Sequence, residues 1–329
     1  MASYLLIGGA GAFAIHTTRY LLAQADTTHV IGVGRNPWPG PLYTLGVGEG
    51  DPRYSFHQIH LVFEQDRLLE LIDAEKPDYV INFAALAYAT SWEKSFRYYE
   101  TNVVAVASLC EQLAKRDFLK RFLQVGTSEL YGSNDHPVSE TAPLKPTSPY
   151  AVSKMAADLH LETMWAVQKF PMNIIRPSNA YGAGQYAYRI LPKAILYGLT
   201  VQRFPMEGGG IAKKSFLCAR DLARAIHLIC HKAPPGEIYN AGTAEPVSMR
   251  RLVEIVAELL GLDFDKFAKI TPGRVGEDSQ YWLDSSKIKA DLGWEPEVDL
   301  HTGIGEMVDW GRRYLDDLKT AQQKFVLRA

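Results

Sequence analysis

The first half of the chain alternates short runs of β-forming residues with longer stretches that have helical spacing. This alternation constrains the fold strongly, because parallel strands need a long crossover connection and a helix normally supplies it. We therefore expect an α/β fold with a doubly wound parallel (Rossmann) sheet, covered by helices on both faces. The predicted strands are residues 3–7, 30–33, 79–82, 122–125 and 173–175, and the predicted helices are 12–25, 64–75, 95–115 and 149–169.

The pattern becomes irregular after Arg176, where residues 177–215 carry many Gly, Pro and Tyr. A chain of 329 residues has room for about two domains of ordinary size. We predict a dinucleotide-binding domain and a smaller C-terminal substrate-binding domain. The first domain comprises residues 1–176, with 212–243 returning to its sheet and containing a further predicted helix at 219–231. The second domain comprises 177–211 and 244–329, with predicted helices at 188–197, 248–260 and 302–318.

Composition excludes several classes of protein. Lys and Arg number 35 against 37 Asp and Glu, a net charge of −2, so a general nucleic-acid binder is not expected. No apolar run is long enough to span a membrane, and we expect no membrane partner. Cys110, Cys218 and Cys230 lack metal-ligand spacing, and the histidines show none either. We therefore predict no metal site, no disulfide framework and a reducing, cytoplasmic location.

A glycine-rich turn follows the first predicted strand and precedes the first predicted helix. It reads Gly9-x-Gly11-x-x-Ala14, the spacing of a dinucleotide-binding fingerprint. Glycine permits the tight turn and lets the backbone approach a pyrophosphate at the helix N-terminus. The residues predicted to contact the dinucleotide here are Gly8, Gly11, Ala12 and Phe13.

The end of the second strand bears on which dinucleotide binds. NAD enzymes usually place an acidic residue there to hold the ribose 2′-hydroxyl. No acid occurs between Asp26 and Glu49, whereas Arg35 and Asn36 follow the strand directly. An arginine can pair with a 2′-phosphate through charge-assisted hydrogen bonds. The sequence therefore favours NADP over NAD.

Tyr150 and Lys154 form a YxxxK pattern within a predicted helix. Positions i and i+4 share one helix face. A phenol ordinarily titrates near ~10, so it is a poor base at neutral pH. A nearby ammonium and a positive nicotinamide ring would favour the phenolate. We therefore predict that Tyr150 removes a hydroxyl proton while hydride leaves the same carbon.

Taken together, the motifs resemble the extended short-chain dehydrogenase/reductase family, in its branch that modifies nucleotide sugars. The resemblance spans nearly the whole chain and rests on several groups of residues besides the glycine turn and the YxxxK pattern. These groups are residues 82–85 (NFAA), Asn102, 127–132 (TSELYG), 176–182 (RPSNAYG), 219–225 (ARDLARA), 283–287 (LDSSK) and 292–294 (LGW).

The triplet Thr127-Ser128-Glu129 distinguishes members of this branch. The resemblance implies that Thr127 hydrogen-bonds the reacting 4-hydroxyl. It also implies that Glu129 is the extra carboxylate that dehydratases have at this position. Simple 4-epimerases usually have small residues there. Thr-Ser-Glu looks like the GDP-mannose 4,6-dehydratases, whereas dTDP-glucose dehydratases more often have Thr-Asp-Glu. Decarboxylases of nucleotide sugars can also carry Thr-Ser-Glu, so the triplet leaves that alternative open.

The resemblance implies a nucleotide-sugar 4,6-dehydratase. Tyr150 would take the O4 proton as hydride moves from C4 to the cofactor. Glu129 would then remove the C5 proton as water leaves C6, and the hydride would return to C6. The alternatives are a 4-epimerase or decarboxylase on the same scaffold and a non-catalytic dinucleotide sensor. The nucleotide base and the sugar are left open.

The resemblance also implies a homodimer, through helices 95–115 and 149–169, and a nucleotide-diphosphate sugar as the partner ligand. Several positions depart from the family pattern, and two of them bear on ligand contacts: His60 stands where an Asp usually contacts the adenine, and Lys214 stands where an Arg often contacts substrate phosphate. The implied contacts are Ala84 and Asn102 for the cofactor, and Ala87, Asn179, Lys193, Arg203, Lys214 and Arg274 for the substrate.

Overall fold

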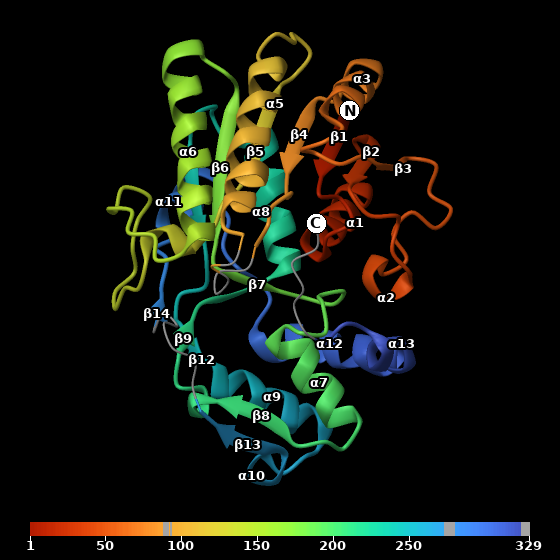
Figure 1. The fold of residues 1–329 in the computed structure, drawn as a ribbon, viewed down its shortest axis with the longest axis vertical. Coiled ribbons are helices and arrows are strands. Elements are labelled where there is room, and N and C mark those ends of the chain that lie inside the picture. Colours follow the sequence, from red (N-terminus) through yellow and green to blue (C-terminus); the bar gives the residue numbers. More distant parts are fainter. Residues whose placement is uncertain (88–91, 93, 273–279, 324–329) are drawn as a thin grey trace.

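A computed structural model describes residues 1–87, 92, 94–272 and 280–323. Its centre is a seven-stranded sheet in the order β3-β2-β1-β4-β5-β6-β11 (Figure 1). All neighbouring strands pair in parallel, which confirms the predicted fold class. The strand order reverses between β1 and β4, the place where open α/β sheets bind ligands. The strands are β1 (Ala2–Ile7), β2 (Thr27–Gly34), β3 (Tyr54–Gln58), β4 (Tyr79–Asn82), β5 (Arg121–Val125), β6 (Met172–Pro177) and β11 (Ile238–Ala241).

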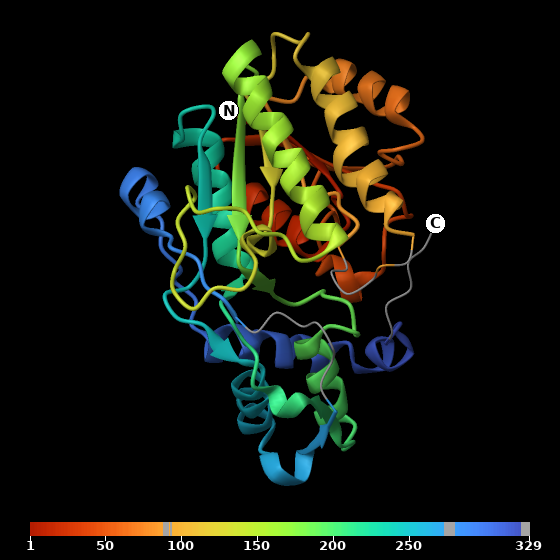
Figure 2. The same ribbon diagram turned by 60° about the vertical axis from the view of Figure 1, so that its left-hand side comes forward.

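Helices cover both faces of this sheet because its strands are apolar on both sides. In β1, Tyr4 and Leu6 join one buried cluster, and Leu5 and Ile7 join the other. Figure 2 shows two of the covering helices, α5 and α6, running along one face. The first face packs against α1 (Ala12–Leu22), α8 (Ala219–Lys232) and α11 (Ser286–Leu292), and the second against α3 (Gln65–Glu75), α5 (Ala105–Leu113) and α6 (Pro149–Gln168).

A smaller lobe lies beyond the carboxyl ends of the strands (Figure 1). It has its own apolar core, to which Ile195, Phe204, Val256 and Met307 contribute. The remaining helices and short strands are α2 (Pro41–Thr44), α4 (Phe96–Tyr99), α7 (Ile190–Leu199), α9 (Met249–Leu260), α10 (Phe264–Phe267), α12 (Leu300–Arg313), α13 (Leu315–Thr320), β7 (Asn179–Tyr181), β8 (Phe204–Glu207), β9 (Lys213–Lys214), β10 (Phe216–Cys218), β12 (Val247–Ser248), β13 (Ala268–Thr271) and β14 (Gln280–Tyr281).

The predicted helix over residues 95–115 is divided in the structure. A π-helical segment, η1 (Glu100–Val104), separates α4 from α5. Such segments often occur at functional sites, because one extra residue in the turn redirects a side chain. Here the side chain of Asn102 lies within the segment and is buried.

The composition led to predictions about cysteines, membrane-spanning segments and metal sites, and the described residues show the following. Cys110, Cys218 and Cys230 are free and buried. Across this part of the chain, none of the helices combines the length and hydrophobicity that a membrane crossing requires. The same residues contain no cluster of His, Cys, Asp or Glu positioned to hold a metal ion.

Candidate active site

The glycine turn after β1 brings three backbone segments into close contact. Gly8 has a φ of +81°, and a Cβ atom on it would lie 2.8 Å from the amide nitrogen of Ala84. A Cβ atom on Gly9 would lie 2.7 Å from the Cα atom of Gly32. Side chains at these positions would separate β1 from its neighbours. The turn ends at Gly11, which directly precedes α1, so the first amides of that helix are open to an anion.

A cleft of about 350 Å³ lies against this turn, at the carboxyl ends of β1, β2 and β4. Its cradle of glycines at a helix N-terminus fits a dinucleotide. Ala87, expected on the substrate side, lies at one edge of this cleft, where its carbonyl oxygen accepts a hydrogen bond of 3.4 Å from Arg189. The cofactor residues predicted from the sequence that line the cleft are Gly8, Gly11, Ala12, Phe13, Arg35, Asn36 and Ala84.

Asn102 differs from the expectation that it contacts the cofactor. Its side chain is 1% exposed and does not line the cleft. Its Oδ1 accepts a hydrogen bond of 2.9 Å from the backbone nitrogen of Leu86, and its Nδ2 donates to the Leu86 oxygen at 3.1 Å and to Ser153 Oγ at 2.9 Å. The amide therefore holds the segment after β4 against α6. The π-helical segment explains this placement, because it turns Asn102 toward α6.

Tyr150, Thr127 and Glu129 lie close together, as the sequence predicts. Thr127 precedes the 3-10 helix η2 (Ser128–Tyr131), and its Oγ1 accepts a hydrogen bond from the Glu129 nitrogen at 3.2 Å. The same side chain hydrogen-bonds the phenol of Tyr150. Burial raises the pKa of Tyr150, the negative charge of Glu129 raises it further, and the bond with Thr127 lowers it. Ser128, between these residues, is buried at 3% exposure.

Lys154 lies on α6 one turn beyond Tyr150 and is 1% exposed. Its Nζ donates a hydrogen bond of 2.7 Å to the carbonyl oxygen of Val125, at the end of β5. Burial lowers the pKa of Lys154 to about 8, and the nearby carboxylate of Asp158 opposes that shift. The ammonium of Lys154 is thus hydrogen-bonded to the end of β5 and is not exposed on the surface of α6.

A second cleft, of about 550 Å³, opens into the smaller lobe. Asn179, Lys193 and Lys214, three of the predicted substrate residues, line it. The Nδ2 of Asn179 is buried and has no hydrogen-bond partner among the described residues, so it is available to a ligand. Arg203 does not line this cleft: it is exposed and donates to the Ala268 carbonyl at 3.2 Å.

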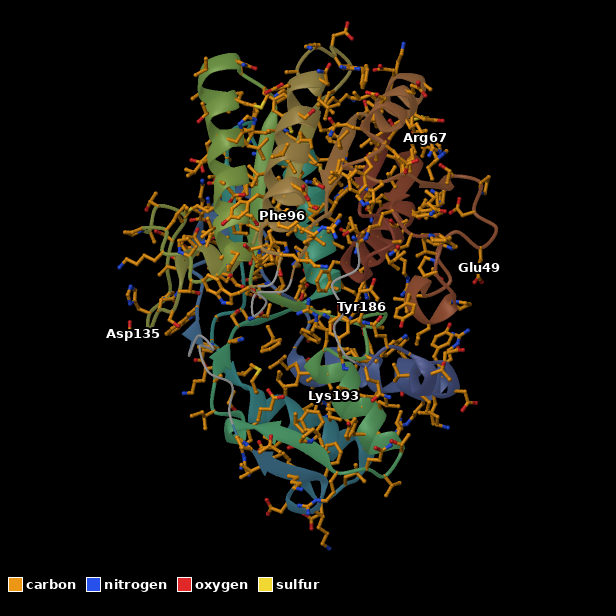
Figure 3. All side chains as sticks on the ribbon, viewed as in Figure 1. Glu49, Arg67, Phe96, Asp135, Tyr186 and Lys193 are labelled. Atoms are coloured by element: carbon orange, nitrogen blue, oxygen red, sulfur yellow. The ribbon has the colours of Figure 1, made fainter. Side chains whose placement is uncertain are left out.

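Arg274, the last predicted substrate residue, lies outside the described residues. The two clefts meet at Gln185, Tyr188 and Arg189, which line both of them. Sequence reasoning did not single out these three residues. Figure 3 places Tyr186, which lines the dinucleotide cleft, near the junction of the lobes, with Lys193 beyond it in the smaller lobe.

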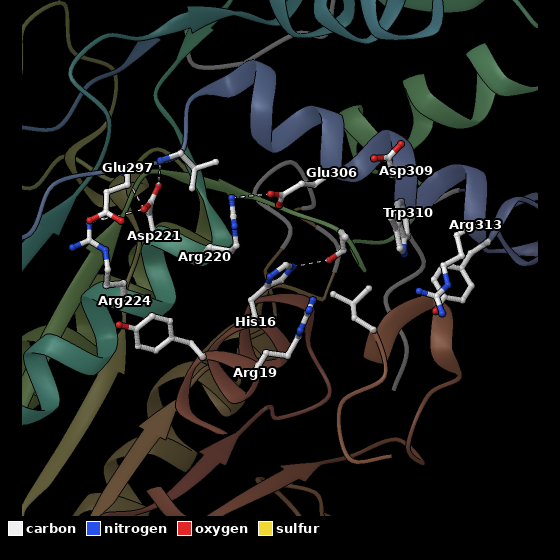
Figure 4. A pocket seen from close by; sticks show the side chains of 15 residues that line it. His16, Arg19, Arg220, Asp221, Arg224, Glu297, Glu306, Asp309, Trp310 and Arg313 are labelled. Carbon is white, nitrogen blue, oxygen red and sulfur yellow. Dashed lines mark hydrogen bonds and ion pairs between the residues drawn. The ribbon is translucent and has the colours of Figure 1, made fainter. Parts of the chain in front are cut away.

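A larger cavity, of about 860 Å³, lies away from both clefts, between helices α1, α8 and α12 (Figure 4). Several of its charged groups neutralise one another: Arg220 pairs with Glu306 at 2.7 Å, and Arg224 pairs with Glu297 at 3.2 Å. Burial lowers the pKa of His16 to about 4, so this histidine is neutral at pH 7. None of the predicted site residues lines this cavity, which joins the lobes through ion pairs.

Comparisons with known proteins agree with this geometry. The family model for GDP-mannose 4,6-dehydratase matches residues 5–307. A curated dTDP-D-glucose 4,6-dehydratase of Mus musculus is 30% identical over 326 residues, which cover 97% of this chain and 91% of that protein.

Two solved structures cover nearly all of the chain. A dTDP-glucose 4,6-dehydratase of Bacillus anthracis in complex with NAD has a TM-score of 0.88 at 28% identity and covers 97% of this chain and 99% of its own. A UDP-glucose 4-epimerase of Thermotoga maritima with UDP-glucose has a TM-score of 0.85 at 26% identity. The match covers 95% of this chain and 99% of the epimerase chain. The chain therefore belongs to the GDP-mannose 4,6-dehydratase family, within the extended short-chain dehydrogenase/reductases that include nucleotide-sugar 4,6-dehydratases and epimerases.

Proposed function

We propose that the protein is a nucleotide-sugar 4,6-dehydratase with a permanently bound nicotinamide dinucleotide. The observation that carries the proposal is the negative charge of Glu129 near the phenol of Tyr150, with Thr127 hydrogen-bonded both to that phenol and to the backbone nitrogen of Glu129. An epimerase needs a base for the 4-hydroxyl alone, whereas a dehydratase needs a second base for the C5 proton. The site contains both groups.

The chain's own residues account for the proton transfers. Tyr150 takes the proton from the sugar O4, and Lys154 holds positive charge near the developing phenolate. A bound nicotinamide dinucleotide supplies the acceptor for the C4 hydride and later returns it to C6. The 4-ketone acidifies the C5 proton, which Glu129 removes and passes to the departing 6-hydroxyl, so that water leaves. When the hydride is returned to C6, C5 takes up a proton from solvent, and Tyr150 releases the proton that it took from O4. Asn179, Lys193 and Lys214 are placed to hold the substrate's diphosphate in the second cleft.

We infer that the dinucleotide is NADP. The support is local: β2 ends without an acidic residue, and the exposed Arg35 lines the cleft at that strand end. The Bacillus anthracis relative was solved with NAD. The nucleotide released on denaturing the purified protein, identified by mass, decides between the two: recovered NAD would count against the role given to Arg35.

The reaction is tested with a panel of GDP-, dTDP-, UDP- and CDP-hexoses, and the products are read by mass. We expect the loss of one water from at least one of them. Glu129→Gln should stop at the 4-keto hexose that retains its 6-hydroxyl, because the C5 proton then has no base. Glu70→Gln, on the exposed surface of α3, is the matched control and should dehydrate normally.

The outcomes separate the alternatives. An epimerised sugar with its 6-hydroxyl in place would identify an epimerase, and loss of carbon dioxide from a nucleotide uronic acid would identify a decarboxylase. Binding without any turnover, in both the wild type and Tyr150→Phe, would identify a dinucleotide sensor. Any of these results would overturn the dehydratase proposal.

We also propose a cytoplasmic homodimer that pairs through α4, α5 and α6, and the two-domain division given above. The support for the dimer is the exposure of large apolar side chains on these helices and on η1: Phe96 is 58% exposed, Val104 63%, Leu159 46% and Val167 75%. Sedimentation should show a dimer that Leu159→Arg converts to monomer.

A further inference from the structure

Four titratable side chains follow one another at intervals of four residues along α6. Tyr150, Lys154, Asp158 and Glu162 each lie one helical turn from the next, so neighbours in this series are close in space. The side chain of Asp158 is 0% exposed, whereas that of Glu162, at the far end, is 39% exposed. Carboxylates are almost never fully buried unless they are paired. None of the proton transfers described above uses Asp158.

Arg176, near the end of β6, holds the carboxylate of Asp158 in place. Its Nε donates a hydrogen bond of 2.9 Å to Asp158 Oδ2, and both side chains are buried. The guanidinium also donates to Tyr131 Oη at 2.9 Å and lies 3.6 Å from Glu162. Burial raises the pKa of Asp158, and the positive charges of Arg176 and Lys154 lower it. Two cations therefore oppose protonation of the buried carboxylate.

The side chains of Asp158 and Lys154 both approach the end of β5. Lys154 Nζ donates to the Val125 carbonyl oxygen at 2.7 Å, and a Cβ atom on the next residue, Gly126, would lie 3.5 Å from Asp158 Oδ2. Lys154 and Asp158, both among the described residues, form no direct ion pair, and the carboxylate acts on the ammonium through its charge. Asp158 Oδ1 is buried and has no hydrogen-bond partner in the described part of the chain, so no donor screens that oxygen.

The charge of Asp158 offsets the cost of burying the ammonium of Lys154. Burial lowers the pKa of Lys154 to about 8, and the negative charge of Asp158 raises it. Without that charge, a smaller fraction of Lys154 would carry a proton at neutral pH. The other titratable groups around the two residues are Arg176 of β6, Glu129 and Tyr131 of η2, Glu140 beyond η2, and Tyr150 and Glu162 of α6.

We propose that Asp158 is a positioning residue for proton transfer, whose carboxylate, fixed by Arg176, keeps the ammonium of Lys154 charged one turn from Tyr150. This inference rests on the proposed function. The signs of charge alternate along the series. The guanidinium keeps Asp158 ionised, the carboxylate keeps Lys154 protonated, and the ammonium favours the phenolate of Tyr150. Asp158 itself exchanges no proton with the substrate and acts through Lys154.

The first measurement follows the proton of Lys154 without any substrate. The free energy of unfolding in urea is measured against pH for each protein and for the same protein carrying Lys154→Met, and the difference isolates Lys154. In the wild type this difference should rise with pH from about 8 to 10.5. In Asp158→Asn the rise should begin about one pH unit lower, because an opposite charge one turn away is lost. Glu162→Gln is the matched control: Glu162 pairs with Arg176 on the same helix, and its removal should leave the wild-type window unchanged.

Two further variants separate the charge of Asp158 from its structural role. Asp158→Asn leaves the Arg176 guanidinium without its buried counter-charge, which destabilises the fold. The double variant Asp158→Asn/Arg176→Gln removes both buried charges together and should show the same lowered window for Lys154. Asp158→Glu retains the negative charge and should restore the wild-type window.

The rate of C4 oxidation distinguishes two routes by their sign. Asp158 also raises the pKa of Tyr150 directly, so its removal by that route alone would favour the phenolate and speed oxidation. Its removal by the route through Lys154 slows oxidation. A fall of about one in the pKa of Lys154 leaves roughly a quarter of it charged at about pH 7.5, against roughly three quarters in the wild type. We therefore expect single-turnover oxidation by Asp158→Asn to be about threefold slower, with KM for the nucleotide sugar changed by less than about twofold.

Two results would overturn the inference. A Lys154 window that stays at its wild-type position in Asp158→Asn and in the double variant would mean that the carboxylate does not hold the proton on Lys154. Faster C4 oxidation by Asp158→Asn would mean that Asp158 acts on Tyr150 directly. The stability measurement uses no nucleotide sugar, so it decides the role of Asp158 toward Lys154 even if no sugar loses water and the proposed function fails.

Discussion

Asn102 donates a hydrogen bond of 2.9 Å to Ser153 Oγ, which in turn donates one of 2.7 Å to the carbonyl oxygen of Tyr150. This chain joins the π-helical segment η1 to the helix that carries the phenol and the ammonium. The same amide pairs with both backbone groups of Leu86, next to the dinucleotide cleft. One buried side chain thus sets the spacing between the cofactor cleft and the proton-transfer groups.

Replacing Asn102 with Ala should destabilise the protein by about 2–3 kcal/mol, because the buried backbone groups of Leu86 lose their partners. Ser153→Ala removes one hydrogen bond of the same network and should cost about 1 kcal/mol. Urea unfolding of both single variants and the double variant measures the coupling, and the two effects should not add. Weakened dinucleotide binding with unchanged stability would instead indicate direct contact with the cofactor.

The pKa of Tyr150 should respond in opposite directions to the removal of two of the charged groups near it, Glu129 and Arg189. Glu129→Gln removes a negative charge that raises the pKa, so the rate of C4 oxidation should reach its alkaline plateau at lower pH. Arg189→Gln removes a positive charge that lowers the pKa, so its plateau should move to higher pH. Single-turnover oxidation isolates this step from dehydration. Shifts of the same sign in both variants would contradict this account.

Lys154 should make stability depend on pH in a defined window. Its folded-state pKa of about 8 lies below its ordinary value of 10.5, so between these values the unfolded chain binds a proton that the folded chain lacks. The free energy of unfolding contributed by this residue therefore rises with pH from about 8 to 10.5. Relative to Lys154→Met, the wild type should gain stability across that window. Parallel stability profiles for the two proteins would mean that the ammonium is not desolvated.

The close approach of β1 to β2 predicts a sharp contrast between two glycines. Gly9→Ala places a Cβ atom 2.7 Å from the Gly32 backbone and should destabilise by about 1–3 kcal/mol, with loss of dinucleotide binding. Gly40→Ala is the control, since no atom lies within 4 Å of its added Cβ and its φ is −68°. Thermal unfolding and cofactor titration of both variants check this. Equal melting temperatures would show that the strands can separate at little cost.

Local sequence was sufficient for five of the seven strands of the sheet and for the central residues of the site, whereas β3 and β11 were not among the predicted strands. Strand and helix periodicity, the glycine spacing and the YxxxK pattern each involve residues that are close in the sequence. They can therefore be interpreted without knowing the rest of the fold. The predicted β4 has the same bounds in the structure, and Tyr150 lies beside Thr127 and Glu129. Within the expected helix 95–115, however, nothing local signalled the π-helical segment at Asn102.

Contacts between distant segments depended on the tertiary structure. Arg203 looked as suitable for a diphosphate as Lys193, yet only Lys193 lines the second cleft, because the packing of α7 against β8 directs the two side chains differently. Arg189 reaches both clefts, and Arg35 and Arg97 share a recess although they lie on different elements. A sequence specifies charge and hydrogen-bonding capacity at each residue, but which surfaces face each other is settled only when the elements pack.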